Sequence, residues 1–176
     1  SWLRGGKKEG DALSFPKGAS FFISFYDADI LRRMICSIRN LPEMFCGMYV
    51  TDITIEDDPD LSSRDEFYCG SPIFIKRRLG TGEIKQYIYD DEHTGDLMKE
   101  TLVSKMRAAG LVEDPTLDIR FDTSASGKKT KLVRYHGISN RASICPVIIN
   151  GKPGTKLFAW NVGIGSCTGI GFGSIY

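Results

Sequence analysis

The sequence predicts an α+β fold made of two ferredoxin-like βαββαβ units in tandem, the first of which lacks its opening strand and helix. Three observations predict this class. The hydrophobic pattern switches between the strand period and the helix period in two successive blocks. A polar stretch at residues 57–63 separates the blocks. The chain has 176 residues, 41% of them hydrophobic, which is enough for two small domains that each bury a core.

The first block has the order strand, helix, strand. The apolar and aromatic run at 19–27 is typical of a strand with a buried face. Asp27 can cap the following helix, which we expect to end near Asn40 and Pro42. Apolar side chains recur along this helix at helical spacing: Ile30, Leu31, Met34, Ile35 and Ile38. The alternating stretch at 48–58 predicts the next strand.

The opening of this first unit is expected to be missing from the numbered chain. Only residues 1–3, or slightly more, could supply an earlier strand, and the chain does not begin with Met. A βαββαβ sheet without its first strand and helix exposes an apolar face and a bare strand edge. We therefore expect that the numbered chain begins inside a longer protein.

The second block is nearly complete. Two β-rich runs, 66–78 and 83–91, flank the sequence LGTG, which has the turn chemistry of a hairpin. A helix is expected from Thr94 or Asp96 through about Ala109, where Gly110 ends it. The remaining elements are strands at 117–122, 129–138 and 143–151, a helix at 153–165 and a closing strand at 171–176. These patterns place the incomplete first unit at 1–58, a linker at 59–65 and the second unit at 66–176.

Charge is distributed unevenly along the chain. The formal net charge is only +1, but residues 1–122 carry −6 and residues 123–176 carry +7 with no acidic residue. The seven basic residues of the second segment are Lys128, Lys129, Lys131, Arg134, Arg141, Lys152 and Lys156. A segment with one sign of charge raises the local concentration of anions, which indicates a polyanion-binding surface. The alternative interpretation is a solvated basic face without a ligand.

The cysteine pattern and the hydropathy disfavour several classes of protein. Five cysteines are scattered without a C-x-x-C pair, which is typical of free thiols in a reducing cytoplasm and argues against a zinc site. No run of about 18 apolar residues could span a membrane, and the N-terminal residues have no apolar core of a secretion signal. We therefore expect a cytoplasmic protein with no membrane partner, metal or other cofactor.

Five glycines fall between residues 163 and 173, after the last expected helix and before the closing strand. Such a cluster has three interpretations. A dinucleotide-binding fingerprint does not fit, because that motif follows a strand and opens a helix. A tight structural connection would use glycine to turn the chain back into an edge strand. An anion cradle would present successive free backbone N–H groups to phosphate, and the basic residues nearby favour this interpretation.

The glycine pattern also has a specific resemblance. Gly163-Ile-Gly165, five further residues and then Gly171-Phe-Gly173 resemble the glycine-rich loop of the CRISPR-associated repeat-processing endoribonucleases, the sixth Cas family. The order SPIFIKRR (71–78), YIYDDE (87–92) and LMKETLVSKMRAAGL (97–111) resembles the middle of that family. FFISFYDADI (21–30) resembles its earlier strand-to-helix passage, so the resemblance extends from about residue 2 to the last residue.

This resemblance implies a fold and a reaction. Members of the family consist of two tandem ferredoxin-like (RRM-like) domains of the RAMP superfamily, bind the repeat of a CRISPR transcript and cut it once per repeat to give guide RNAs. The resemblance implies metal-independent cleavage, in which the ribose 2′-hydroxyl attacks the scissile phosphate and leaves a 2′,3′-cyclic phosphate and a 5′-hydroxyl. His, Tyr and Lys usually supply the base, the acid and the cationic stabilisation.

No catalytic residue is assigned from the sequence. The histidine that usually acts in the family lies on the first helix of the first domain, which this chain lacks, and its own histidines are His93 and His136. His93 is expected in a solvated turn or helix cap. His136 lies in the basic segment and could act as an acid or base, although a strand-end histidine is more typical of a structural or RNA-facing role.

The resemblance and the charge pattern together suggest RNA-binding residues in three places: the end of the 66–78 run, the basic segment and the glycine-rich loop. These residues are Lys76, Arg77, Arg78, Lys128, Lys129, Lys131, Arg134, Arg141, Gly163, Gly165, Gly171, Phe172 and Gly173. Residues 76–78 could instead be a solvated strand end. Phe172 could stack on a base or pack in the core, and Tyr135 is left unassigned.

Three functions follow as alternatives. The chain could be a CRISPR repeat endoribonuclease, a protein that binds the repeat without cutting it, or an unrelated tandem RRM-like RNA-binding protein. The third lacks support because the aromatic-rich strand motif of RNA-binding RRM domains is absent from the sequence. The expected partner is CRISPR repeat RNA, and the resemblance leaves open a homodimer and contacts with other CRISPR effector subunits.

Overall fold

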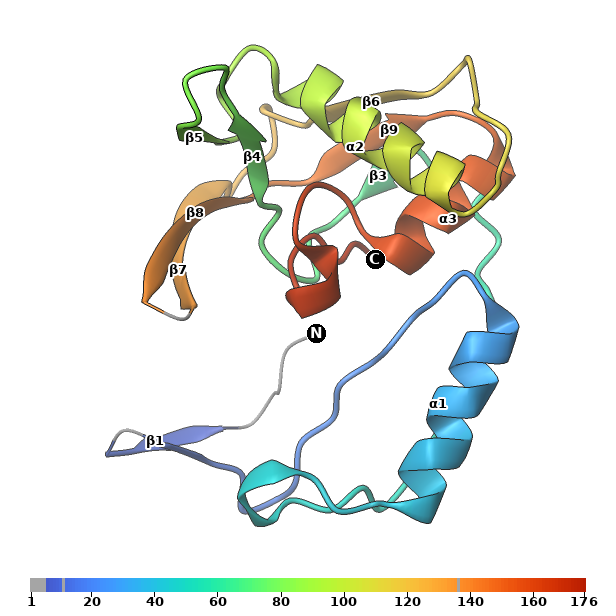
Figure 1. The fold of residues 1–176 in the computed structure, drawn as a ribbon, viewed down its shortest axis with the longest axis vertical. Coiled ribbons are helices and arrows are strands. Elements are labelled where there is room, and N and C mark those ends of the chain that lie inside the picture. The colour runs from blue at the N-terminus through green and yellow to red at the C-terminus, as the bar shows by residue number, and fades with distance from the viewer. Residues whose placement is uncertain (1–5, 11, 136) are drawn as a thin grey trace.

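The computed structural model describes residues 6–10, 12–135 and 137–176 and has an α+β fold with three α-helices and short antiparallel strands (Figure 1). A three-stranded sheet lies at the centre of residues 66–176. In it, β3 (Glu66–Phe67) and β6 (Asp118–Phe121) both pair with β9 (Val147–Asn150). With α2 (Thr94–Ala108) after β3 and α3 (Pro153–Val162) after β9, this part follows the order of a βαββαβ unit.

The end of the chain extends this sheet beyond β3. Cys69 and Ile175 form an isolated antiparallel bridge. The backbone N–H groups of Tyr68 and Tyr176 each donate to the other residue's carbonyl at 3.0 Å. The closing strand expected at 171–176 is therefore reduced to this bridge, and it places the C-terminus beside β3.

One hydrophobic core holds the sheet and both helices together. On α2 the apolar positions recur at helical spacing and are at most 7% exposed: Leu97, Met98, Leu102 and Met106. On β6 the buried residues alternate with exposed ones, so Ile119 and Phe121 face the core. Phe158 of α3 and Val147 of β9 belong to the same cluster. The helical and strand periods of the sequence thus converge on one interior.

Two β-hairpins are inserted into this unit. The bounds of their strands are β4 (Ile75–Arg78), β5 (Ile84–Tyr87), β7 (Lys129–Tyr135) and β8 (Ile138–Ile144). The first hairpin lies between β3 and α2, and the second between β6 and β9; both extend to the left in Figure 1. The predicted LGTG turn is confirmed, because the Leu79 amide donates to the Glu83 carbonyl at 2.8 Å.

Two expected strands are divided by proline. The run at 66–78 forms β3 and β4 rather than one strand, and Pro72, which has no N–H, lies between them. The expected strand at 143–151 combines the end of β8 with β9, and Pro146 separates the two. The strand β8 itself, which begins at Ile138, was not expected. The last helix ends at Val162 instead of 165, because Gly163 takes a φ of +74°.

The N-terminal residues fold as expected only in their helix. α1 (Ala28–Asn40) begins where predicted, and Oδ1 of Asp27 accepts hydrogen bonds from the amides of Asp29 and Ile30 at 2.9 and 3.1 Å. The strands expected at 19–27 and 48–58 are wrong: the described residues there form no strand, since no neighbouring strand pairs with them. The other elements are β1 (Lys7–Glu9), β2 (Ala12–Ser14) and the 3₁₀ turn η1 (Phe45–Gly47). The opening strand expected from residues 1–3 lies outside the described residues.

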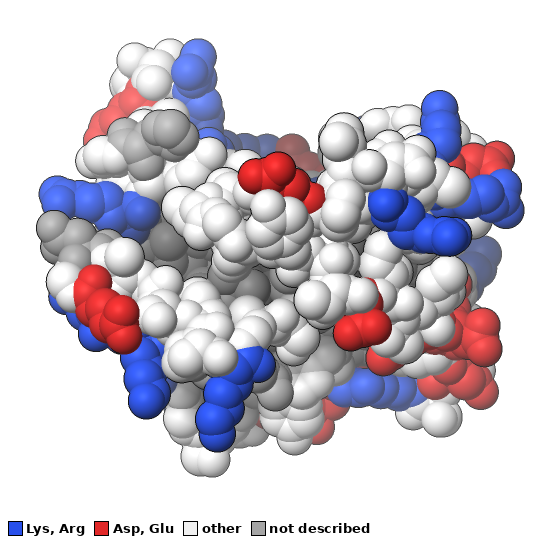
Figure 2. Space-filling view, turned by 90° about the horizontal axis from the view of Figure 1, so that it is seen from below, with Lys and Arg blue, Asp and Glu red and all other residues white. Residues whose placement is uncertain are grey.

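Apolar side chains of this N-terminal part are exposed. No residue of α1 is buried, although its apolar positions have helical spacing. Leu41, Phe45 and Ile55 are 78%, 67% and 73% exposed. In the view of the molecule from below, residues other than Lys, Arg, Asp and Glu occupy much of the middle of the surface (Figure 2). Contact with the rest of the chain comes through the extended segment before α1, where the Ser24 hydroxyl donates to the Asn161 carbonyl at 3.0 Å and the Tyr26 ring meets the Phe158 ring at 5.4 Å.

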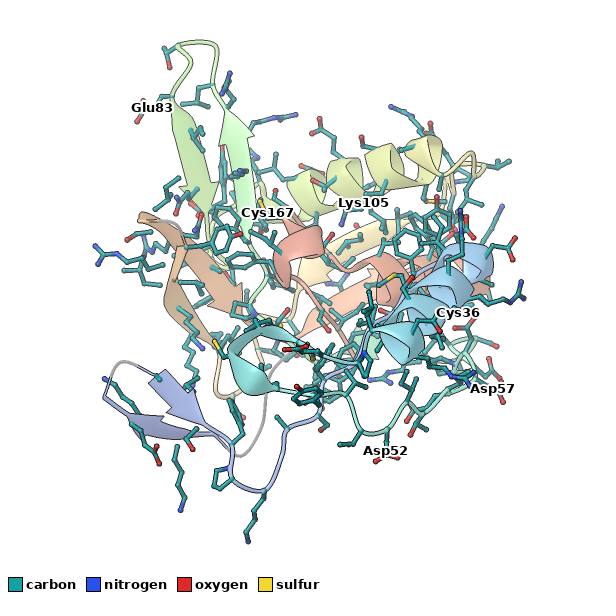
Figure 3. The ribbon with its side chains drawn as sticks, turned by 60° about the horizontal axis from the view of Figure 1, so that its bottom comes forward. Cys36, Asp52, Asp57, Glu83, Lys105 and Cys167 are labelled. Atoms are coloured by element: carbon teal, nitrogen blue, oxygen red, sulfur yellow. The ribbon has the colours of Figure 1, made fainter. Side chains whose placement is uncertain are left out.

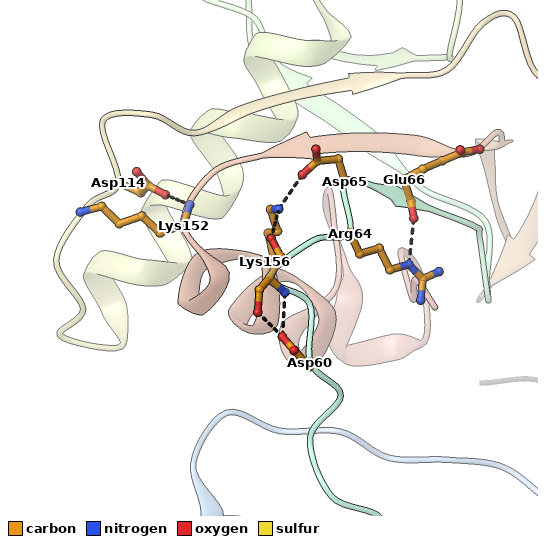
Figure 4. Close-up of polar contacts among 8 residues, drawn as sticks. Asp60, Arg64, Asp65, Glu66, Asp114, Lys152 and Lys156 are labelled. Atoms are coloured by element: carbon orange, nitrogen blue, oxygen red, sulfur yellow. Dashed lines mark hydrogen bonds and ion pairs between the residues drawn. The ribbon is translucent and has the colours of Figure 1, made fainter.

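Buried polar residues fix the start of α3 (Figure 4). The ammonium of Lys156, a residue only 4% exposed, lies 2.5 Å from a carboxylate oxygen of Asp65 just before β3. Asp114, 3% exposed, accepts from the Lys152 amide at 2.7 Å and from the Thr155 hydroxyl at 2.9 Å. Burial alone would raise the pKa of the Asp114 carboxyl, but the hydrogen bonds from Thr116, Lys152 and Thr155 outweigh it and hold the pKa well below its ordinary value. These contacts tie the glycine-rich end of the chain to the sheet.

Candidate functional site

Five of the basic residues singled out from the sequence lie on or beside the β7–β8 hairpin. Their positions are Lys128 before β7, Lys129, Lys131 and Arg134 on β7, and Arg141 on β8. Residues opposite one another in an antiparallel pair share a face. Lys131 is opposite Ala142 and Arg134 is opposite Ser139, while Arg141 is opposite Leu132. One face of the hairpin therefore carries Lys129 and Lys131, and the other carries Arg134 and Arg141.

The β4–β5 hairpin lies next to this one. Gln86 joins them, because its Nε2 donates to the Ser139 carbonyl at 3.2 Å and its Oε1 accepts from the Arg141 amide at 2.7 Å. Neither contact was visible in the sequence pattern. The two basic hairpins are thereby held as neighbours.

The basic residues of β4 differ in their surroundings. The Arg77 guanidinium pairs with the Glu100 carboxylate of α2 at 2.5 Å, and both side chains are about half exposed. The Lys76 ammonium lies over the Phe74 ring, 5.8 Å from its centroid. Arg78 is exposed at the end of the strand, opposite Ile84. Of these three residues, Arg77 carries a charge that a neighbouring acid already balances.

The glycine-rich loop does not present the row of free amides expected for an anion cradle. The amide of Gly163 donates to the Ala159 carbonyl at 2.8 Å, that of Gly173 to Pro72 at 2.9 Å and that of Gly171 to Thr168 at 3.0 Å. Amides used in this way cannot also bind phosphate. The cradle is therefore wrong at these three positions, and the tight structural connection is the interpretation that the structure supports.

Close backbone contact explains why glycine is needed there. At Gly165, where φ is +81°, a Cβ atom would lie 2.6 Å from the Phe74 carbonyl oxygen. At Gly173, where φ is +70°, it would overlap the Ile164 carbonyl oxygen. A side chain at either position would force the loop away from β4 and from its own first turn. Both residues are buried, whereas Gly169–Gly171 form the exposed tip.

A groove of about 400 Å³, hereafter the β7 groove, lies between the β7–β8 hairpin and this tip. Its lining comes from residues 131–134 of β7, from 71–72 before β4 and from 170–172 of the loop. Phe172 was considered for base stacking or for the core, and the structure has it in the core: it is 6% exposed, with its ring 5.2 Å from the Phe74 ring. Val133 packs against the same cluster. Charged and apolar side chains thus meet in one hollow.

Lys105 of α2 contacts the glycine-rich loop (Figure 3). Its ammonium donates to the Gly163 carbonyl at 2.8 Å and to the Thr168 hydroxyl at 3.2 Å, so it joins two points of the loop that are five residues apart. Burial lowers the pKa of Lys105 to about 8. This role was not predicted from the sequence, although Lys105 falls three positions after Leu102 on the apolar side of α2, where a lysine is unusual.

His93, one of the two histidines considered for acid–base chemistry, is not among the residues that line the β7 groove. His93 is exposed at the N-terminal end of α2, and it makes no side-chain capping hydrogen bond. His136 lies outside the described residues. Within the part of the chain that the structure describes, no three His, Cys, Asp or Glu side chains come together as metal ligands. In the same part, no helix has the length and apolar character to cross a membrane.

The chain is similar to known proteins of one kind. A family model described as "CRISPR associated protein Cas6, C-terminal" matches residues 56–176. A solved structure described as "CRISPR associated protein Cas6" has 16% identity and a TM-score of 0.80, covering 99% of this chain and 74% of its own. A search of curated proteins by sequence gives no match.

Two further solved structures share the fold. The first, described as "Characterization of a Cas6-related gene from Pyrococcus furiosus", has 18% identity and a TM-score of 0.78, covering 100% of this chain and 76% of its own. The second, described as "An RAMP protein binding different RNA substrates", has 20% identity and a TM-score of 0.74, covering 98% and 75%. These likenesses confirm the α+β class of tandem ferredoxin-like folds predicted from the sequence.

Proposed function

The chain belongs to the Cas6 family of CRISPR-associated proteins, and we propose that it binds CRISPR repeat RNA and cleaves the precursor transcript within each repeat. The family match and the fold support a CRISPR-related RNA partner. The proposal includes metal-independent attack by the ribose 2′-hydroxyl, which requires protein groups for proton transfer and for charge stabilisation but no bound ion.

The observation that carries the RNA-binding part is the charge of the β7–β8 hairpin. Residues 128–144 contain five basic residues and no acid, on a hairpin that borders the β7 groove. A phosphodiester backbone is bound mainly by such lysines and arginines, and it needs no base-specific contact for that. Lys76 and Arg78 on the neighbouring hairpin would extend the basic surface, while Arg77 would have to leave Glu100 to join it.

The glycine-rich loop takes a different part in this proposal. Its buried glycines fix the path of the backbone against Phe74 and Pro72, and its exposed tip shapes one wall of the groove. Gly163, Gly165 and Gly173 would therefore affect RNA through the shape of the loop. We propose the division into a first unit at 1–58, a linker at 59–65 and a second unit at 66–176 as the frame for this site.

A second function is repeat binding without cleavage. It is favoured by the position of His93, which is the one histidine among the described residues and lies exposed at the end of α2 rather than in the β7 groove. We assign no catalytic residue to the chain. The two functions share the same RNA and differ only in the fate of the phosphodiester bond.

Incubation with a labelled repeat RNA in EDTA separates these functions. Cleavage that persists in chelator and yields a 2′,3′-cyclic phosphate end supports the endoribonuclease. RNA that is retained intact over the same time supports the binding protein. A repeat that binds no more tightly than a scrambled RNA of equal length and composition would reject both.

A further inference from the structure

We propose that the β7 groove receives one unpaired nucleobase of the bound RNA, an inference that rests on the RNA binding proposed above. The groove has about 400 Å³, within the range of about 300–1,000 Å³ that small-molecule sites usually have. It is therefore large enough for one nucleotide.

The composition of the groove matches the two sides of a nucleotide. Leu132 on β7 and Ile170 on the loop both line the groove and are 66% and 51% exposed, so apolar side chains open to solvent lie at its edges. Val133 and Phe172 close the groove from beneath as part of a buried cluster. Apolar side chains, as well as aromatic ones, can flank the faces of a base that has left its stack.

Two cations complete the recognition of a nucleotide. Lys131 and Arg134 line the groove from opposite faces of β7, so each would contact the phosphate on one side of the inserted base. Their neighbours Lys128 and Lys129 continue along the chain toward the start of β7, which gives the RNA backbone a basic path. Among the described residues, no acidic side chain lines the groove.

The edge of β7 offers hydrogen-bonding groups for the rim of the base. Among the described strands β7 pairs only with β8, so alternate residues of β7 direct backbone N–H and C=O groups away from that partner. Backbone groups of an edge strand can bond the pairing edge of a nucleobase. In a duplex that edge is already paired and both faces are stacked, so the occupant has to be unpaired.

The groove is formed before any ligand arrives. Lys105 holds Thr168 at 3.2 Å, the Ser166 amide donates to the Phe74 carbonyl at 2.7 Å and the Gly173 amide donates to Pro72 at 2.9 Å. A wall held in this way does not have to be ordered on binding, which lowers the entropic cost of taking up a base.

The test combines abasic RNA with a groove variant. The probes are the repeat RNA and a series in which one nucleotide at a time lacks its base, all with 2′-fluoro riboses so that they cannot be cut. The variant is Leu132→Ser with Ile170→Ser, two exposed residues whose replacement leaves the core intact. Its control is Leu111→Ser with Val112→Ser, which are 42% and 88% exposed after α2, at the other end of that helix from the hairpins.

The expected result is a coupling between one base and the groove. One abasic position, in an unpaired stretch, weakens binding to the unmodified protein about tenfold, as loss of one stacked base does. The groove variant binds the intact repeat about tenfold more weakly. That variant loses less than about twofold from the same abasic change, and the control variant behaves as the unmodified protein.

Other results overturn the inference in distinguishable ways. If the repeat binds but no abasic position loses its effect in the groove variant, or if the responsive position is base-paired, the base pocket is wrong and RNA binding stands. If the intact repeat binds no better than a scrambled RNA, the proposed function fails and the base pocket fails with it.

Discussion

Replacing Lys105 by methionine should change how the stability of the protein depends on pH. The side chain is largely buried between α2 and the glycine-rich loop, and burial lowers the pKa of its ammonium to about 8 from the ordinary 10.5. No acidic group is among its hydrogen-bond partners, which are the Gly163 carbonyl and the Thr168 hydroxyl. The folded state therefore holds this proton less firmly than the unfolded state does.

The sign and size follow from this difference. Between pH 8 and 10.5 the unfolded chain binds more protons at this position than the folded one, so the contribution of Lys105 to the free energy of unfolding rises with pH. The difference between the folded and unfolded pKa values of Lys105 corresponds to roughly 3 kcal/mol in the free energy of unfolding. Between pH 7.5 and 9.5 about 2 kcal/mol of it should appear.

The measurement is urea unfolding at several pH values from 7.5 to 9.5, for the unmodified protein, Lys105→Met and a control, Lys99→Met on the same helix. The gap in stability between the unmodified protein and Lys105→Met should move in favour of the unmodified protein by about 2 kcal/mol as pH rises. Lys99→Met leaves the Gly163 and Thr168 contacts in place and should run parallel to the unmodified protein. If the stability of Lys105→Met ran parallel to that of the unmodified protein across this pH range, the lowered pKa of the buried Lys105 ammonium would be refuted.

Three further predictions concern the hairpin, the loop and the start of α3. Replacing the lysines at 128, 129 and 131 by alanine should weaken repeat binding and reduce the slope of log K against log salt by about 2. Binding titrations at several salt concentrations measure this slope. An unchanged slope would mean that these lysines do not contact the RNA phosphates. Gly165→Ala should cost about 1–3 kcal/mol of stability because its Cβ meets the Phe74 carbonyl, while Gly169→Ala, with open space around it, should cost less than about 1 kcal/mol; equal losses by thermal unfolding would contradict the packing. Asp114→Asn should lower the free energy of unfolding by about 1–3 kcal/mol at pH 7. Because the pKa of the Asp114 carboxyl is lowered in the folded state, this difference in stability should shrink as pH falls below the ordinary pKa of 3.8. A difference that stays constant down to pH 2 would contradict the lowered pKa.

The sequence predicted best what depends on neighbouring residues. Asp27 caps α1, Gly110 takes a φ of +70° after α2 and the LGTG turn closes the β4–β5 hairpin, because caps and turns are determined within a few residues. The strands expected at 19–27 and 48–58 failed for the opposite reason. Alternation of apolar residues indicates a buried face, but a strand also needs a partner, and pairing is not encoded within the segment itself.

The sequence predicted the charges of the candidate site and named Gly171 and Phe172 of its lining, but not how these residues come together. The excess of lysine and arginine after residue 122 can be counted from the sequence without knowing the fold. The β7 groove combines residues 71–72, 131–134 and 170–172, which are far apart in sequence and meet only because Ile73 bridges to Ser143 and the loop returns to Pro72. Gln86 and Lys105 were missed because their partners, Ser139 and Gly163, lie more than 50 residues away.

The corrected role of the glycines changes how the site should respond to mutation. Had the loop bound phosphate through free amides, charge recognition and loop shape would reside in the same residues, and one substitution would alter both. Instead the amides of Gly163, Gly171 and Gly173 donate to carbonyls of α3, of the loop itself and of Pro72, while the cations lie on a separate hairpin. Substitutions of the buried glycines should therefore act on stability and on the fit of a base, and substitutions of the hairpin lysines on the dependence of binding on salt. A glycine variant that changed the salt slope as strongly as a lysine variant would mean that the loop itself neutralises phosphate.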